Sequence, residues 1–221
     1  MKKLIDWLKN LWNRRKNVKE NVEVETVTPP YTFPIISDKQ LTIIPRPLTY
    51  HRSRKREVSG IILHSMREYI EYVGKYVHYH DYLEAVKLSA HYFVEVNGDV
   101  INSVHPERCA YHAGKSKIGD EINLNESFIG VELIIKDEGN YGDFLKKIKD
   151  PQYFHDIQYE NMAKLCVKLM DRYNISIDRV VSHHEVSGID VRPDPKRDIG
   201  SGFDLDRFYR LIDKYSDLTL N

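Results

Sequence analysis

The chain has 221 residues, which suits one ordinary domain with a tail and leaves little room for two full domains. Its apolar fraction of 41%, with 15 tyrosines and 7 phenylalanines, is sufficient for a packed core and excludes a disordered chain. The 33 basic and 33 acidic residues cancel, so the overall charge does not indicate nucleic-acid binding.

The first 20 residues are predicted to form a basic amphipathic helix. They contain seven Lys or Arg and two Asp or Glu. This composition suits an anionic membrane surface, and packing on the domain or on a partner protein is an equally good interpretation. Asp6 and Lys9 interrupt the apolar run, so we expect no secretory signal and no membrane span. The apolar residues share one helical stripe: Leu4, Trp7, Leu8 and Leu11.

Residues 21–40 are interpreted as a linker. Prolines at positions 29, 30 and 34 stop helices and do not fit a central strand. Residues 41–221 are then predicted to form the single folded domain.

Strands and helices alternate along this domain. Strands are predicted where β-branched and aromatic residues gather, at 58–64, 89–96, 100–104, 128–135 and 179–183. Asn97-Gly98 predicts a tight hairpin turn between two of them. Helices are predicted at 67–86, 158–173 and 204–216. The alternation predicts an α/β fold, in which helices flank a central, mainly mixed β-sheet and the functional cleft lies at the strand ends.

Two of the predicted strands end in histidine. His64 follows an apolar run, and His183 follows Val-Val-Ser. A single histidine at such a place is more often a core or surface residue, but carboxylates at Asp194 and Asp198 follow soon after the second. Two neutral imidazoles and a carboxylate suit zinc, and three protein ligands leave the fourth tetrahedral position for water.

The domain also carries six short phrases in a fixed order. They are Ile61-Ile62-Leu63-His64, Ser89-Ala90-His91-Tyr92 with the turn Asn97-Gly98-Asp99, His112-Ala113-Gly114, Ile129-Gly130-Val131-Glu132-Leu133, Val180 to His183, and Lys196-Arg197-Asp198 through Phe203-Asp204. Together they resemble the zinc N-acetylmuramoyl-L-alanine amidases, the superfamily that includes the peptidoglycan recognition proteins. The resemblance covers about residues 41–215.

This resemblance implies a role for each matching position. His64, His183 and Asp198 would hold zinc at the strand ends. Glu132 would activate the zinc-bound water, and Lys196 would stabilise the oxyanion. The implied reaction is hydrolysis of the amide bond between N-acetylmuramic acid and the L-alanine of the peptidoglycan stem peptide.

The residues themselves allow other readings of these positions. A carboxylate at Glu132, between apolar neighbours, needs a partner, and a metal site would supply one. Lys196 lies in a charged loop, where it would otherwise be a solvated charge. By family position His91 and His112 are expected to contact substrate, although His91 lies in a predicted strand and could equally be core.

Two ambiguities concern the ligand set. Asp194 has the following proline that is usual in the family, whereas Asp198 keeps the lysine, the glycine and the spacing to Phe203-Asp204, and we choose Asp198. His184 directly follows His183. Adjacent strand residues point to opposite faces, so only His183 should reach the metal.

The alternatives to a wall-degrading amidase are a peptidoglycan-binding module without catalysis and a cytoplasmic amidase that recycles muropeptides. The apparently complete ligand set favours catalysis. The expected partners are peptidoglycan or muropeptides, and a membrane surface through residues 1–20, with no nucleic acid. We expect synthesis in the cytoplasm, with action on the wall after release, as for a phage lysin, or on cytoplasmic muropeptides.

Overall fold

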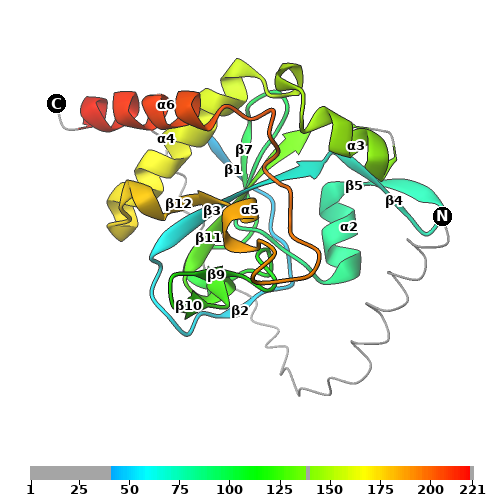
Figure 1. Ribbon diagram of the computed structural model, residues 1–221, viewed down its shortest axis with the longest axis horizontal. Helices are drawn as coiled ribbons and strands as arrows, with labels where there is room; N and C mark the ends of the chain where they lie inside the picture. The colour runs from blue at the N-terminus through cyan, green and yellow to red at the C-terminus, as the bar shows by residue number, and fades with distance from the viewer. Residues whose placement is uncertain (1–40, 138–139, 220–221) are drawn as a thin grey trace. The chain divides into compact units, whose positions relative to one another are not determined.

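The computed structural model describes residues 41–137 and 140–219, so the predicted helix at 1–20 and the linker at 21–40 lie outside it. A six-stranded sheet forms the centre, in the order β1-β7-β6-β11-β3-β12 (Figure 1). Only β6 and β7 pair antiparallel, and the other neighbours in this sheet pair parallel. Its strands are β1 (Ile43–Pro45), β3 (Gly60–Arg67), β6 (Tyr92–Val94), β7 (Val100–Asn102), β11 (Phe128–Ile135) and β12 (Val180–Ser182).

Three two-stranded ribbons and several helices complete the described fold. The ribbons pair β2 (Arg52–Ser53) with β8 (Arg108–Cys109), β4 (Tyr69–Tyr72) with β5 (Lys75–His78), and β9 (Lys117–Ile118) with β10 (Glu121–Ile122). The α-helices are α2 (Tyr79–Val86), α3 (Tyr141–Lys147), α4 (Asp156–Tyr173), α5 (His183–Val186) and α6 (Leu205–Thr219). Single 3₁₀ turns lie at Leu124–Glu126, Pro151–Tyr153 and Ile177–Arg179. The mixed sheet flanked by helices is the predicted fold class.

The two central strands are buried on both faces, which explains their nearly continuous apolar sequences. Leu63 and Leu133 belong to a core with residues of α4 and α6. Ile62 belongs to a separate cluster with Phe128. Since side chains alternate along a strand, His64 points to the same face as Ile62, away from α4 and α6.

The hairpin of β4 and β5 corrects one prediction. A helix was predicted for 67–86, but only residues 79–86 are helical, as α2. The preceding segment alternates aromatic and β-branched residues and forms β4 and β5. Val73 and Gly74, with φ of 51° and 75°, make the tight turn between them. The reversal is therefore encoded locally, at a two-residue turn.

The other predicted elements differ mainly at their ends. Residues 128–135 form β11 as predicted. Gly98 makes the turn predicted between β6 and β7, with its N–H donating to the carbonyl of Glu95 at 2.8 Å. Strand β3 continues to Arg67, so His64 lies inside the strand and not at its end. In the described ranges, no helix combines the length and the apolar character that crossing a membrane requires.

Replacing Leu133 by alanine tests the core on the α4 side of the sheet. Leu133 is fully buried, so Leu133→Ala should lower the free energy of unfolding by about 2–5 kcal/mol. Ile177→Ala is the control, because Ile177 is 41% exposed and its truncation should cost less than about 1 kcal/mol. Urea unfolding at fixed metal concentration measures both. Equal effects would contradict the assigned core.

Candidate active site

Three potential metal ligands converge on one point of the structure. Nδ1 of His64 lies 3.0 Å from Nδ1 of His183 and 3.1 Å from Oδ2 of Asp198. Nδ1 of His183 lies 2.8 Å from the same carboxylate oxygen. Three donor atoms from three separate segments thus form a small triangle.

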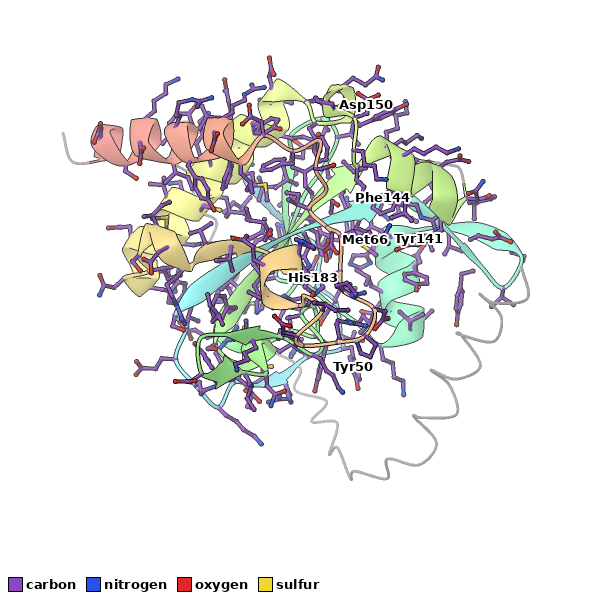
Figure 2. The ribbon with its side chains drawn as sticks, in the orientation of Figure 1. Tyr50, Met66, Tyr141, Phe144, Asp150 and His183 are labelled. Atoms are coloured by element: carbon purple, nitrogen blue, oxygen red, sulfur yellow. The ribbon has the colours of Figure 1, made fainter. Side chains whose placement is uncertain are left out.

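The fold brings each of these residues to the triangle. His183 is the first residue of α5, immediately after β12, whose Ser182 is the register partner of Leu63 in β3 (Figure 2). The loop that carries Asp198 is held on both sides. The Asp198 carbonyl accepts from the His184 N–H at 2.9 Å, and the Ile199 carbonyl accepts from the Ser65 hydroxyl at 2.9 Å.

The triangle fits a zinc ion in donor type and in size. Tetrahedral zinc with bonds of about 2.0–2.1 Å places its ligand atoms roughly 3.3 Å apart, close to the separations of the three donors here. Burial, together with the neighbouring His183, lowers the pKa of His64 to about 4, so its imidazole is neutral. Burial opposes ionisation of Asp198, but hydrogen bonds and charge from His183 and His64 outweigh it and hold the pKa of Asp198 below its usual range.

Glu132 and Lys196 lie beside the triangle. Glu132 is the register partner of His64, and its Oε1 is 4.0 Å from the His64 Nδ1. Burial raises the pKa of Glu132 well above its usual value, the charge of Asp198 raises it further, and Lys196 opposes both. The charge of Lys196 therefore acts on this carboxyl group, and its role toward the oxyanion stays a prediction.

The structure separates the two aspartates and the two histidines that the sequence left ambiguous. Asp194 is exposed, and both its carboxylate oxygens accept from the Arg192 guanidinium at 3.1 Å. Only Asp198 is near the histidines. His184 is exposed, and its Nδ1 is 2.7 Å from the carbonyl of Lys196. It points away because it is the second residue of a helix, not the next residue of a strand.

His91 and His112, the expected substrate contacts, occupy different environments. His91 is 0% exposed, and its ring nitrogens lie 2.9 Å from the Gly130 N–H and 3.0 Å from the Arg108 carbonyl. Because the His91 ring has no accessible surface, its position differs from the one expected of a residue that contacts substrate. His112 is partly exposed, and its Nδ1 is 3.0 Å from Nε2 of His64.

The backbone carbonyls that contact the histidine rings of the site could not be predicted from the sequence. Nε2 of His183 lies 3.1 Å from the Ala113 carbonyl, and Nε2 of His112 lies 3.3 Å from the Phe128 carbonyl. A carbonyl is present at every residue, so no residue type marks it. Tyr141 was also missed: burial raises the pKa of its phenol, and the charge of Asp198 raises it further.

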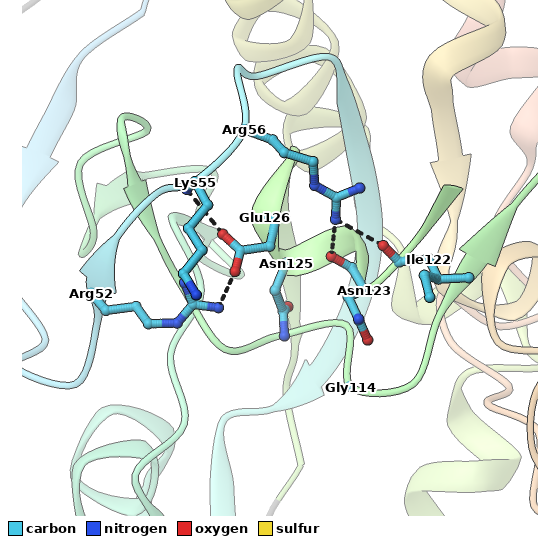
Figure 3. A pocket seen from close by; sticks show the side chains of 8 residues that line it. All are labelled: Arg52, Lys55, Arg56, Gly114, Ile122, Asn123, Asn125 and Glu126. Atoms are coloured by element: carbon cyan, nitrogen blue, oxygen red, sulfur yellow. Dashed lines mark hydrogen bonds and ion pairs between the residues drawn. The ribbon is translucent and has the colours of Figure 1, made fainter. Parts of the chain in front are cut away.

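A pocket of about 460 Å³ opens beside the loop that carries His112, and none of the predicted site residues lines it (Figure 3). Its charges are largely paired. Arg52 bonds to Glu126, and Arg56 donates to the carbonyls of Ile122 and Asn123 at 2.8 and 2.6 Å. The lining residues are Arg52, Lys55, Arg56, Gly114, Ile122, Asn123, Asn125 and Glu126.

Residues 54–199 match the N-acetylmuramoyl-L-alanine amidase family, and the chain belongs to that family. It is similar to the 1,6-anhydro-N-acetylmuramyl-L-alanine amidase AmpD of Enterobacter cloacae, with 30% identity over 130 residues, covering 59% of this chain and 60% of the relative. AmpD of Haemophilus influenzae is 32% identical over 124 residues, covering 56% and 58%. The chain thus spans about 60% of the length of these curated relatives.

Solved structures support the fold. A selenomethionine derivative of AmpD matches with a TM-score of 0.57 at 22% identity, over 77% of this chain and 94% of that one. The Staphylococcus aureus hydrolase AmiA, solved with its ligand, matches with a TM-score of 0.55 at 15% identity, over 81% and 85%. Both likenesses are at the level of the fold.

Exchanging each aspartate for alanine tests the metal site. Asp198→Ala should abolish stoichiometric zinc binding, because it removes one of three ligands, whereas Asp194→Ala should leave zinc content unchanged. Elemental analysis after dialysis gives the zinc content of both variants. Loss of zinc in Asp194→Ala alone would show that the ligand is four residues earlier.

Proposed function

We propose that this chain is a zinc-dependent amidase that hydrolyses the bond between N-acetylmuramic acid and L-alanine in peptidoglycan or its fragments. The observation that carries the proposal is the donor triangle with Glu132 beside it, in a chain of this family. A binding module needs no acid–base group next to its metal ligands. The arrangement therefore favours catalysis.

The chain's own residues divide the chemical work. A zinc ion held by His64, His183 and Asp198 would supply Lewis acidity and lower the pKa of a bound water toward about 7. Glu132 accepts the proton that the attacking water gives up and delivers it to the departing amine nitrogen. Lys196 places positive charge where the amide carbonyl oxygen becomes negative.

The substrate contact that we propose is His112. Residue 112 is partly exposed and next to His64, and we propose that a muramyl or peptide group at the triangle reaches it. The burial of His91 gives that residue a supporting position behind Gly130.

The relatives support a proposal for the class of substrate. AmpD is named for 1,6-anhydro-N-acetylmuramyl-L-alanine, which favours soluble anhydromuropeptides as the second candidate beside intact wall. Comparing the rates on purified cell walls and on anhydromuropeptides distinguishes the two, with free stem peptide as the product measured. Binding to walls without release of peptide would instead support a recognition module.

Glu132→Gln tests the proposed proton transfer. The variant keeps a side chain of the same size but cannot accept the proton, so turnover should fall about 10²–10⁴-fold while zinc stays bound. Glu57→Gln, at an exposed position, is the matched control and should keep normal turnover. Near-normal release of stem peptide by Glu132→Gln would remove this residue from the mechanism.

We propose membrane contact for residues 1–20 on their composition alone. A chain that starts at residue 38 should keep zinc and cleave soluble substrate but bind anionic vesicles more weakly, and the binding of the full chain should weaken with salt. Vesicle co-sedimentation measures this. Equal binding by both chains would favour a protein partner, and unfolding of the shortened chain would favour packing on the domain.

A further inference from the structure

His112 lies between the backbone carbonyl of Phe128 and Nε2 of the predicted zinc ligand His64, the ring nitrogen that is not part of the donor triangle. The Phe128 carbonyl can only accept a hydrogen bond, so the Nε2 of His112, 3.3 Å away, must carry the proton. In a neutral imidazole the other nitrogen is then an acceptor. That nitrogen, Nδ1, lies 3.0 Å from Nε2 of His64.

The direction of this contact favours the Nε2–H tautomer of His64, against the Nδ1–H tautomer that Asp198 favours. Nε2 of His64 must donate to Nδ1 of His112, which leaves Nδ1 of His64 without a proton. The Ala113 carbonyl does the same for His183, because it lies 3.1 Å from Nε2 of that ring. In this tautomer the Nδ1 of each ring keeps a lone pair toward Asp198, and a metal ion bound there would take that lone pair in place of the proton that Nδ1 otherwise donates to the carboxylate.

Gly130 makes room for the His112 ring. A Cβ at position 130 would lie 2.5 Å from Cγ and 2.6 Å from Nδ1 of His112, which is closer than such atoms approach. The backbone there is held by its N–H bond to His91 at 2.9 Å. His112 also meets His64 edge to face, with ring centroids 5.1 Å apart. The ring is thus held by both contact and hydrogen bonding.

We propose that His112 is a positioning residue that holds His64 in the tautomer able to bind zinc, and that Gly130 is glycine because any side chain would displace His112. The inference rests on the proposed function for the identity of the metal. The contacts of His112 with His64 and with the Phe128 carbonyl do not depend on that identity.

Two substitutions of His112 separate a relay from simple packing. Phenylalanine keeps the ring shape but has no hydrogen-bonding atoms, whereas glutamine can both donate and accept. If His112 only fills space, His112→Phe is the milder change. If it relays a hydrogen bond, His112→Gln is the milder change. His112→Phe then weakens zinc binding about 10–100-fold, the usual effect of removing a residue that hydrogen-bonds to a metal ligand.

The readouts are zinc affinity, by competition with a chromophoric chelator, and the tautomer of His64, by long-range proton–nitrogen NMR of metal-free protein. We expect a larger Nε2–H population of His64 in the wild type than in His112→Phe, where only the Nδ1–H donation to Asp198 remains. Gly130→Ala leaves the chemistry of His112 intact but displaces its ring, so it should resemble His112→Phe. If His112→Phe does not fold, Gly130→Ala is measured in its place. His80→Phe, on α2, is the control and should match the wild type.

Greater loss of zinc affinity in His112→Gln than in His112→Phe would overturn the proposal. So would an unchanged His64 tautomer in folded His112→Phe or Gly130→Ala. Failure of the wild type to bind zinc would instead contradict the proposed function, and the spectrum of the metal-free protein would still decide whether the relay exists.

Discussion

The parallel register between β3 and β11 is the constraint on which the site depends, because it places His64 directly beside Glu132. A slip of one residue would turn either side chain to the opposite face of the sheet, toward α4 and α6. The apolar neighbours prevent such a slip, since Leu63 and Leu133 are buried on that face. The pairing of β12 with β3 then brings His183 next to His64. The predicted ligand and the proposed base therefore lie on the two central strands, which are buried on both faces.

This arrangement concentrates ionisable groups where water is scarce. Burial disfavours the charged form of each group, and the histidines compensate for it at Asp198 but not at Glu132, whose pKa is raised. A carboxyl group held in such a place lowers stability, so it is kept where function needs it, and perturbed carboxyl groups gather at functional sites for that reason. The contrast between Asp198 and Glu132 matches their different proposed roles, one as a ligand and the other as a proton carrier.

The sequence predicted the parts of this site that local patterns encode. The apolar runs around His64 and Glu132 identified the central strands, and helix α4 followed from its apolar periodicity. The region 67–86 was mistaken for one helix because aromatic and β-branched residues also occur in helices, and only the turn at Gly74 reveals the hairpin. The spacing to Phe203-Asp204 favoured Asp198 over Asp194, but it did not encode the loop bonds to His184 and Ser65 that hold the segment of Asp198 in place. The buried position of His91 depends on its contact with the backbone N–H of Gly130, which is distant in the sequence.

Residues 112–114 explain how the back of the site is organised. His112 contacts His64, the Ala113 carbonyl contacts His183, and Gly114 lines the neighbouring pocket. The loop is held by Asn125, whose Oδ1 accepts from the N–H groups of His112 and Ala113 at 3.1 and 2.8 Å. One amide thus sets the position of both groups that orient the imidazoles, and Asn125 itself lines the pocket. A single loop therefore orients both imidazoles of the triangle, those of His64 and His183. The geometry of the triangle depends on that loop as much as on the strands.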